Sequence, residues 1–70
     1  MKGGATITTK VEAIRKERGL TQAELAEKLG VQQSTISLIE NAARNPSANL
    51  LVKIADVLDV TIDELIDKAG

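Results

Sequence analysis

The feature that most constrains this chain is the short spacing, about three residues, between two amphipathic helical segments. The first segment opens at Thr21, with Glu24 three residues later in a capping-box pattern, and it stops at Gly30. The second segment runs from about Gln33 to Asn41. Gly30 can adopt the left-handed conformation that ends a helix and turns the chain sharply. Two helices joined so tightly cross at a steep angle, and this spacing predicts a helix-turn-helix unit.

The apolar residues of this unit suit such a crossing. Ala26 supplies a small side chain where the two helices approach each other. The residues that can close one core around the crossing are Leu25, Leu29, Val31, Ile36 and Ile39. The second helix begins after Gln32, a residue that caps helices poorly, so we expect its amino end to be held less firmly.

The segment before this unit predicts one helix. Thr9 and Glu12 form a capping-box pattern for a helix that ends at Gly19. Residues 1–8, which include two glycines, predict a flexible N-terminal arm. The predicted domain then spans residues 9–68.

The segment after the unit predicts two more helices. Ser47 caps a helix that follows a loop at residues 41–47 and whose buried stripe is Leu51, Ile54, Ala55 and Leu58. Thr61 and Glu64 form a capping box for a short last helix. Since no stretch alternates as a strand should, the predicted fold class is all-α, a compact domain of five helices.

The composition excludes several classes of function. The 70 residues include no cysteine, histidine or aromatic residue. Without cysteine there is no thiolate metal site, and without histidine the usual general base is missing. Without aromatic residues there is no platform on which single-stranded nucleic acid could stack. We expect no enzyme activity, no cofactor, no metal and no small-molecule substrate. No apolar run approaches the roughly 20 residues of a membrane span, so we expect a cytoplasmic protein without membrane contact.

Charge is unevenly distributed along a chain whose net charge is −1. Residues 1–20 carry five cations and two carboxylates, a balance of +3. Residues 45–70 carry two cations and five carboxylates, a balance of −3. A polyanion could therefore approach only one side of the fold. Small domains also show such unevenness by chance, so charge alone leaves the partner open.

One face of the helix at residues 33–41 carries an unusual set of side chains. Gln33, Ser34, Ser37 and Asn41 fall within about 100° of arc at 3.6 residues per turn. These uncharged groups hold a helix poorly, whereas a solvated face normally carries lysine and glutamate. The face either contacts a partner or is simply a polar surface in water.

The stretch TQAELAEKLGVQQSTISLIEN, followed by RNPS and LLVKIADVL, resembles the lambda-repressor-like (Cro-type, XRE-family) helix-turn-helix family. The resemblance covers roughly residues 10–66. It implies a five-helix domain that binds operator DNA, with the third helix in the major groove. The implied function is that of a sequence-specific regulator of transcription that binds double-stranded DNA. A repressor acting at a palindromic operator is the expected form.

The resemblance also implies which residues contact DNA. Base contacts are expected from Gln33, Ser34, Ser37 and Leu38. Gln33 would be the leading reader, because its amide can pair with adenine in bidentate fashion. Leu38, where family members usually carry a polar or basic residue, could meet a thymine methyl or a protein partner. Phosphate contacts are expected from Thr21, Gln22, Thr35, Asn41, Arg44 and Lys10.

Other positions carry structural expectations. Arg15 and Glu40 match a pair that in this family bonds internally between the first and third helices, with a phosphate contact by Arg15 as the alternative. Ala42 replaces the glycine that usually follows Glu-Asn, and Glu12 replaces a residue that is often arginine. These departures predict few phosphate contacts and a modest salt dependence of binding.

A homodimer is expected because one reading helix contacts only a few base pairs. Two copies related by a twofold axis would place their third helices about 34 Å apart, one turn of DNA. Val57, Ile62 and Ile66 are the predicted interface, or alternatively they complete a small core. An acidic cluster in the same region would be repelled by DNA and is expected on the far side.

A second function remains open on the same residues. Leu38, Ala42 and the acidic net charge are consistent with a helix-turn-helix fold used as a protein-interaction module. An antitoxin-like partner with weak or no DNA binding is an example. Titration with double-stranded DNA separates the two hypotheses, because only the regulator binds a palindrome tightly and in a salt-sensitive way.

Overall fold

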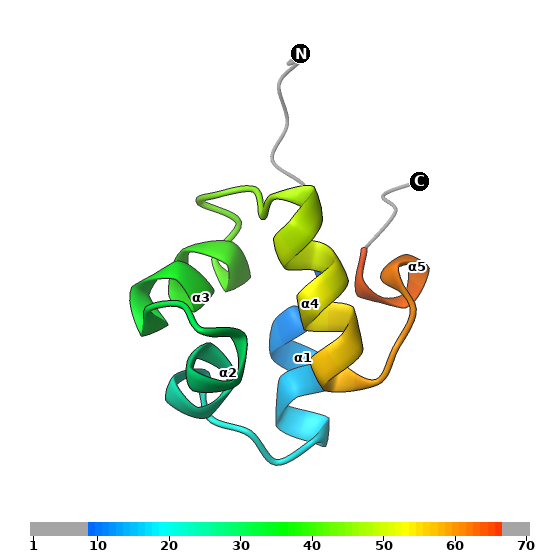
Figure 1. The fold of residues 1–70 in the computed structure, drawn as a ribbon, viewed down its shortest axis with the longest axis horizontal. Coiled ribbons are helices and arrows are strands. Elements are labelled where there is room, and N and C mark those ends of the chain that lie inside the picture. Colours follow the sequence, from blue (N-terminus) through cyan, green and yellow to red (C-terminus); the bar gives the residue numbers. More distant parts are fainter. Residues whose placement is uncertain (1–8, 67–70) are drawn as a thin grey trace.

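The computed structural model describes residues 9–66 as five α-helices around one core (Figure 1). The helices are α1 (Val11–Glu17), α2 (Gln22–Leu29), α3 (Gln33–Glu40), α4 (Ala48–Leu58) and α5 (Ile62–Leu65). Figure 1 shows α2 and α3 on one side of α4 and α5 on the other. The all-α, five-helix prediction is confirmed. The predicted arm at residues 1–8 and the end of the predicted domain at 67–68 lie outside the described residues.

Side-chain caps hold the amino ends of α2, α4 and α5, as predicted. At α2, the backbone N–H of Glu24 donates to Thr21 Oγ1 (3.0 Å), and the N–H of Thr21 donates to Glu24 Oε1 (2.8 Å). Thr61 and Glu64 form the same reciprocal pair at α5, with distances of 3.1 and 2.9 Å. Ser47 accepts a backbone N–H from the first turn of α4 (3.1 Å). The amino end of α3 has no such bond.

The predicted capping box at the start of α1 is wrong. The helix begins at Val11, and its N-cap residue, Lys10, makes no side-chain capping bond. Thr9 instead forms an antiparallel bridge with Ile66, and the backbone N–H of Lys10 donates to the carbonyl of Leu65 (2.7 Å). This pairing ties residues 9 and 10 to the end of α5, so Thr9 does not cap α1. Its buried Oγ1 has no hydrogen-bond partner.

The turn between α2 and α3 has the geometry that its spacing predicts. Gly30 ends α2 with a φ of +74°, in the left-handed region that glycine adopts without strain. The N–H of Val31 donates back to the carbonyl of Ala26 (3.0 Å) and closes the turn. Both helices thereby reach one shared core, whose fully buried side chains are Val11, Leu25, Ile36, Ile39, Ile54, Leu58 and Leu65.

Candidate nucleic-acid interface

The α3 helix turns its apolar residues inward and leaves a polar face accessible. Ile36 and Ile39, at 0% and 1% exposure, fasten the helix to the core. The accessible side chains are the exposed Gln33, Ser34, Leu38 and Asn41 and the half-buried Thr35 and Ser37. Leu38 is the apolar member of this set and is 41% exposed. We call this set the α3 face. It contains every residue that the sequence predicted to contact bases.

Two of the predicted phosphate-contact residues, Thr35 and Asn41, belong to the α3 face, and three others flank it. Thr21 and Gln22 lie at the start of α2, next to the amino end of α3, and Arg44 follows the end of α3. Arg44 is exposed in the loop that leads to α4. Lys10 lies elsewhere, because its backbone is bonded to the end of α5.

A buried ion pair joins α1 to α3. Arg15 is 6% exposed, and its Nε and Nη2 donate to Glu40 Oε2 (2.7 Å) and Oε1 (3.1 Å). Its Nη1 also donates to the carbonyl of Leu20 (2.8 Å). The hydrogen bonds to Glu40 raise the pKa of Arg15 above its ordinary value, against the opposing effect of burial. The guanidinium is therefore engaged inside the protein.

The same carboxylate also positions the start of α2, which the sequence reasoning missed. Gln22 Nε2 donates to Glu40 Oε1 (2.9 Å). Gln33 Nε2 in turn donates to Gln22 Oε1 (3.5 Å). A phosphate-contact candidate and a base-contact candidate are thus joined into one hydrogen-bonded series. The sequence contained one indication of this contact, since Gln22 and Gln33 are the first residues of two helices that a tight turn brings together.

The cations of α1 do not gather around the α3 face. Arg18 Nε donates to the carbonyl of Leu58 (2.9 Å), which holds this side chain at the carboxyl end of α4. Lys16 forms an exposed ion pair with Glu12 (3.2 Å). With Arg15 buried, three of the cations counted in the basic half of the sequence make contacts within the fold.

Of the predicted dimer residues, Val57 belongs to α4, Ile62 begins α5 and Ile66 follows it. Figure 1 shows α5 across α4 from α3. Ile62 is 36% exposed, whereas Val57 and Ile66 are partly buried and packed against the core. Val52 on α4 is 55% exposed, and the sequence reasoning did not single it out. Of the three predicted residues, Ile62 therefore presents the most surface to a second copy.

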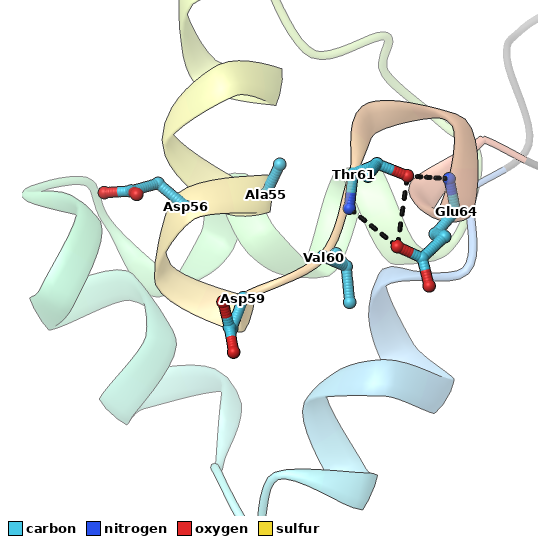
Figure 2. Close-up of a pocket in the computed structure, with 6 residues that line it drawn as sticks. All are labelled: Ala55, Asp56, Asp59, Val60, Thr61 and Glu64. Atoms are coloured by element: carbon cyan, nitrogen blue, oxygen red, sulfur yellow. Dashed lines mark hydrogen bonds between the residues drawn. The ribbon is translucent and has the colours of Figure 1, made fainter.

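Acidic side chains surround the junction of α4 and α5. Figure 2 shows Asp59 and Glu64 there, with the Glu64 carboxylate turned back to Thr61, and Asp56 on α4 with its carboxylate pointing away from α5. With Ala55 and Val60 they line a hollow of about 280 Å³. Among residues 9–66, no cluster of three or more carboxylate, histidine or cysteine side chains could hold a metal ion. No helix in this part of the chain is long and apolar enough to cross a membrane.

Comparisons with known proteins bear directly on this arrangement. The sequence model of a family described as "Helix-turn-helix" matches residues 11–65. The HTH-type transcriptional regulator SinR of Bacillus subtilis (strain 168) is 44% identical over 63 residues, which cover 89% of this chain and 57% of SinR. An uncharacterized HTH-type transcriptional regulator of Archaeoglobus fulgidus is 42% identical over 57 residues, which cover 81% of each chain.

A solved structure shares the fold. The crystal structure of the master regulator for biofilm formation SinR in complex with DNA matches with a TM-score of 0.73 and 44% identity. The match covers 77% of this chain and 87% of that chain. The chain spans only 57% of the length of the full SinR protein, so the similarity is limited to that part of SinR.

Proposed function

Because the chain belongs to the helix-turn-helix family, we propose that it binds double-stranded DNA in a sequence-specific way and regulates transcription. The observation that carries the proposal is the α3 face: an accessible row of hydrogen-bonding groups on a helix fastened from behind by Ile36 and Ile39. A B-DNA major groove admits an α-helix and displays a distinct pattern of donors and acceptors for each base pair. The α3 face is suited to read such a pattern.

Each residue of the α3 face has a specific part in this proposal. Gln33 pairs with a base edge at the start of α3, and Ser34 and Ser37 add single hydrogen bonds. Leu38 packs against a thymine methyl group. The phosphate contacts come from Thr21, Gln22, Thr35, Asn41 and Arg44, whereas Lys10, which is bonded to the end of α5, lies apart from the α3 face. The positive end of the α2 helix dipole supports the contact at Gln22.

The distribution of charge supports an approach of DNA from the α3 side. Asp56, Asp59 and Glu64 lie around the α4–α5 junction, and α5 lies across α4 from α3 (Figures 1 and 2). A polyanion is repelled by that surface and meets none of these carboxylates at α3. The protein acts as a cytoplasmic repressor in this proposal, and a homodimer covers a palindromic operator through Val57, Ile62 and Ile66.

One observation favours a second candidate function. Leu38 is exposed in the middle of the α3 face, where it could contact an apolar patch on another protein. In that case the chain is a protein-interaction module with weak or no DNA binding.

In vitro selection from a random duplex library at low salt tests the proposal. We expect the wild-type protein to enrich a palindrome with half-site centres one helical turn apart. Gln33→Ala should lose preference at one position per half-site, at a cost of about 1–3 kcal/mol. Arg44→Ala should weaken binding to every sequence alike and lower the salt slope by about one. No enrichment by folded wild-type protein would contradict DNA reading and favour the interaction module.

A further inference from the structure

The outermost row of the α3 face places one apolar side chain between two polar ones. At 3.6 residues per turn, Ser34, Leu38 and Asn41 fall within about 60° of arc, opposite the buried Ile36 and Ile39, and all three are exposed. We infer that this row reads the C5-methyl group of a pyrimidine, whether the base is thymine or 5-methylcytosine. Methylation of cytosine at C5 then strengthens binding. The inference rests on the proposed DNA-reading function and adds a modified base to its ligands.

Leu38 supplies the apolar contact. The exposed large apolar side chains among residues 9–66 are Leu38, Val52 and Ile62, and Leu38 is the one on α3. In the major groove of unmodified DNA, the methyl group at C5 belongs to thymine. 5-Methylcytosine carries the same methyl group on the same ring atom. Because contact between apolar groups has no directional requirement, Leu38 gains equally from either methyl group.

The polar groups on either side of Leu38 suit both bases. Beside the methyl group, thymine shows an acceptor, O4, whereas cytosine shows a donor, N4–H₂. The Ser34 hydroxyl can donate or accept, and the Asn41 amide has a carbonyl and an NH₂ group. Ser34 Oγ donates to Gln32 Oε1 at 3.5 Å, a long bond that the hydroxyl can give up by rotating. The row therefore accommodates thymine and 5-methylcytosine.

No charge on α3 favours one base pair over the other. A carboxylate in the groove would favour cytosine by accepting from N4, and arginine or lysine would favour guanine. The charged residue of α3 is Glu40, whose side chain is 2% exposed and paired with Arg15. Leu38 and its polar neighbours are uncharged. The methyl group is therefore the feature by which this row discriminates among pyrimidines.

Binding to modified duplexes tests the inference. In vitro selection with wild-type and Leu38→Ala proteins first locates the position at which the variant loses preference. Fluorescence anisotropy then compares duplexes that carry thymine, uracil, 5-methylcytosine or cytosine there, each opposite its complementary purine. We expect the wild type to favour thymine over uracil, and 5-methylcytosine over cytosine, by about fourfold per half-site in each case. This is the gain expected from burying one methyl group.

Leu38→Ala should bring both affinity ratios close to one. Val52→Ala is the matched control, because it removes an exposed apolar side chain from α4 and should leave both ratios unchanged. A wild-type protein that favours thymine over uracil but not 5-methylcytosine over cytosine would overturn the inference and leave DNA reading intact. The same holds if Leu38→Ala keeps both ratios or alters preference at no position. A wild-type protein that prefers no sequence would overturn both proposals.

NMR of the complexes tests the contact itself. Nuclear Overhauser effects should connect the δ-methyl protons of Leu38 with the C5-methyl protons of the base, both in the thymine duplex and in the 5-methylcytosine duplex. Their absence from the 5-methylcytosine complex would contradict the inference, because the higher affinity would then have another source.

Discussion

Arg15 shows how much one residue can organise in a chain of this size. Its guanidinium lies between α1 and α3 and makes hydrogen bonds to both oxygens of Glu40 and to the carbonyl of Leu20. The interior around it is aliphatic, so an unpaired charge there would be strongly unfavourable. Removing one partner would leave the other as an unpaired buried charge, so each partner depends on the other in the folded state.

Arg15→Ala should lower the free energy of unfolding by about 3–5 kcal/mol, because it leaves the Glu40 carboxylate buried without its main partner. Urea denaturation followed by circular dichroism measures this change. Lys16→Ala is the control, since the exposed pair of Lys16 with Glu12 is worth less than about 1 kcal/mol. Similar losses in the two variants would contradict a structural role for the buried pair.

At the scale of helices, four of the five described helices end in a common way. Gly19, Gly30, Ala42 and Asp59, which follow α1 to α4, all have positive φ, between 58° and 74°. In each case the next residue donates its N–H back to a carbonyl in the last turn, as Ala43 does to Leu38 (2.9 Å). Glycine adopts this conformation readily, but a residue with a Cβ is strained in it. The departure noted at Ala42 therefore has a conformational cost.

Ala42→Gly should raise the free energy of unfolding by about 1 kcal/mol, because it removes the Cβ strain at a φ of +58°. Thermal denaturation monitors the change. Ala43→Gly, at the next position and without a positive φ, should give no gain, since glycine there only adds freedom to the unfolded chain. A gain in both variants would mean that strain at Ala42 is not the cause.

The capping boxes of α2 and α5 should make stability depend on acid. Backbone N–H groups of Thr21 and Thr61 donate to Glu24 and Glu64 and hold the pKa of each carboxyl below its ordinary value of 4.5. The folded state then binds fewer protons than the unfolded state, so stability rises with pH. We expect the carboxyl groups to contribute their full stabilisation at pH values above 4.5. This stabilisation is lost as the pH falls through the lowered pKa values that the two groups have in the folded state.

Chemical denaturation at a series of acidic pH values measures this dependence. The Glu24→Gln and Glu64→Gln double variant should show a flatter curve than the wild type, because its capping groups no longer titrate. Glu27→Gln, an exposed change on α2 outside the capping box, should leave the slope unchanged. If the double variant lost stability in acid as steeply as the wild type, the acid dependence would arise from groups other than Glu24 and Glu64.

At the scale of the whole molecule, the two sides of α4 differ in chemistry. The α3 face is uncharged and accessible on one side, whereas the α4–α5 junction is acidic on the other (Figures 1 and 2). Ile62 lies next to that junction with 36% of its surface exposed. In the proposed function, this division places the contact with a second copy at α5 and the contact with DNA at α3.

Ile62→Ser should weaken association between protomers by about tenfold or more, because each copy loses one apolar side chain from the proposed interface. Analytical ultracentrifugation, with and without a palindromic duplex, measures this effect. Val52→Ser is the control at an exposed apolar position outside the predicted interface. If Val52→Ser alone weakens association, the interface lies on α4 instead of at Ile62.

The sequence alone predicted the number, type and most of the ends of the helices. Capping boxes at Thr21 and Thr61, the cap at Ser47 and the turn at Gly30 depend on residues within a few positions of one another. Such signals act locally, so they can be read without knowing the fold. Four residues of the α3 face, Gln33, Ser34, Ser37 and Asn41, were accessible to the same reasoning, because helical period alone places them together. Thr35 and Leu38 were expected there from the family resemblance.

Apart from the Arg15–Glu40 pair, which the family resemblance implied, only the tertiary structure decided which distant groups meet. Thr9 pairs with Ile66 instead of capping α1, Arg18 is held by the carbonyl of Leu58, and Gln22 is bonded to Glu40. Gln22 and Glu40 are 18 positions apart in the sequence, and Arg18 and Leu58 are 40 positions apart. Local sequence determines how each segment folds. The choice among long-range partners depends on how the helices pack, because packing decides which polar groups come within bonding distance.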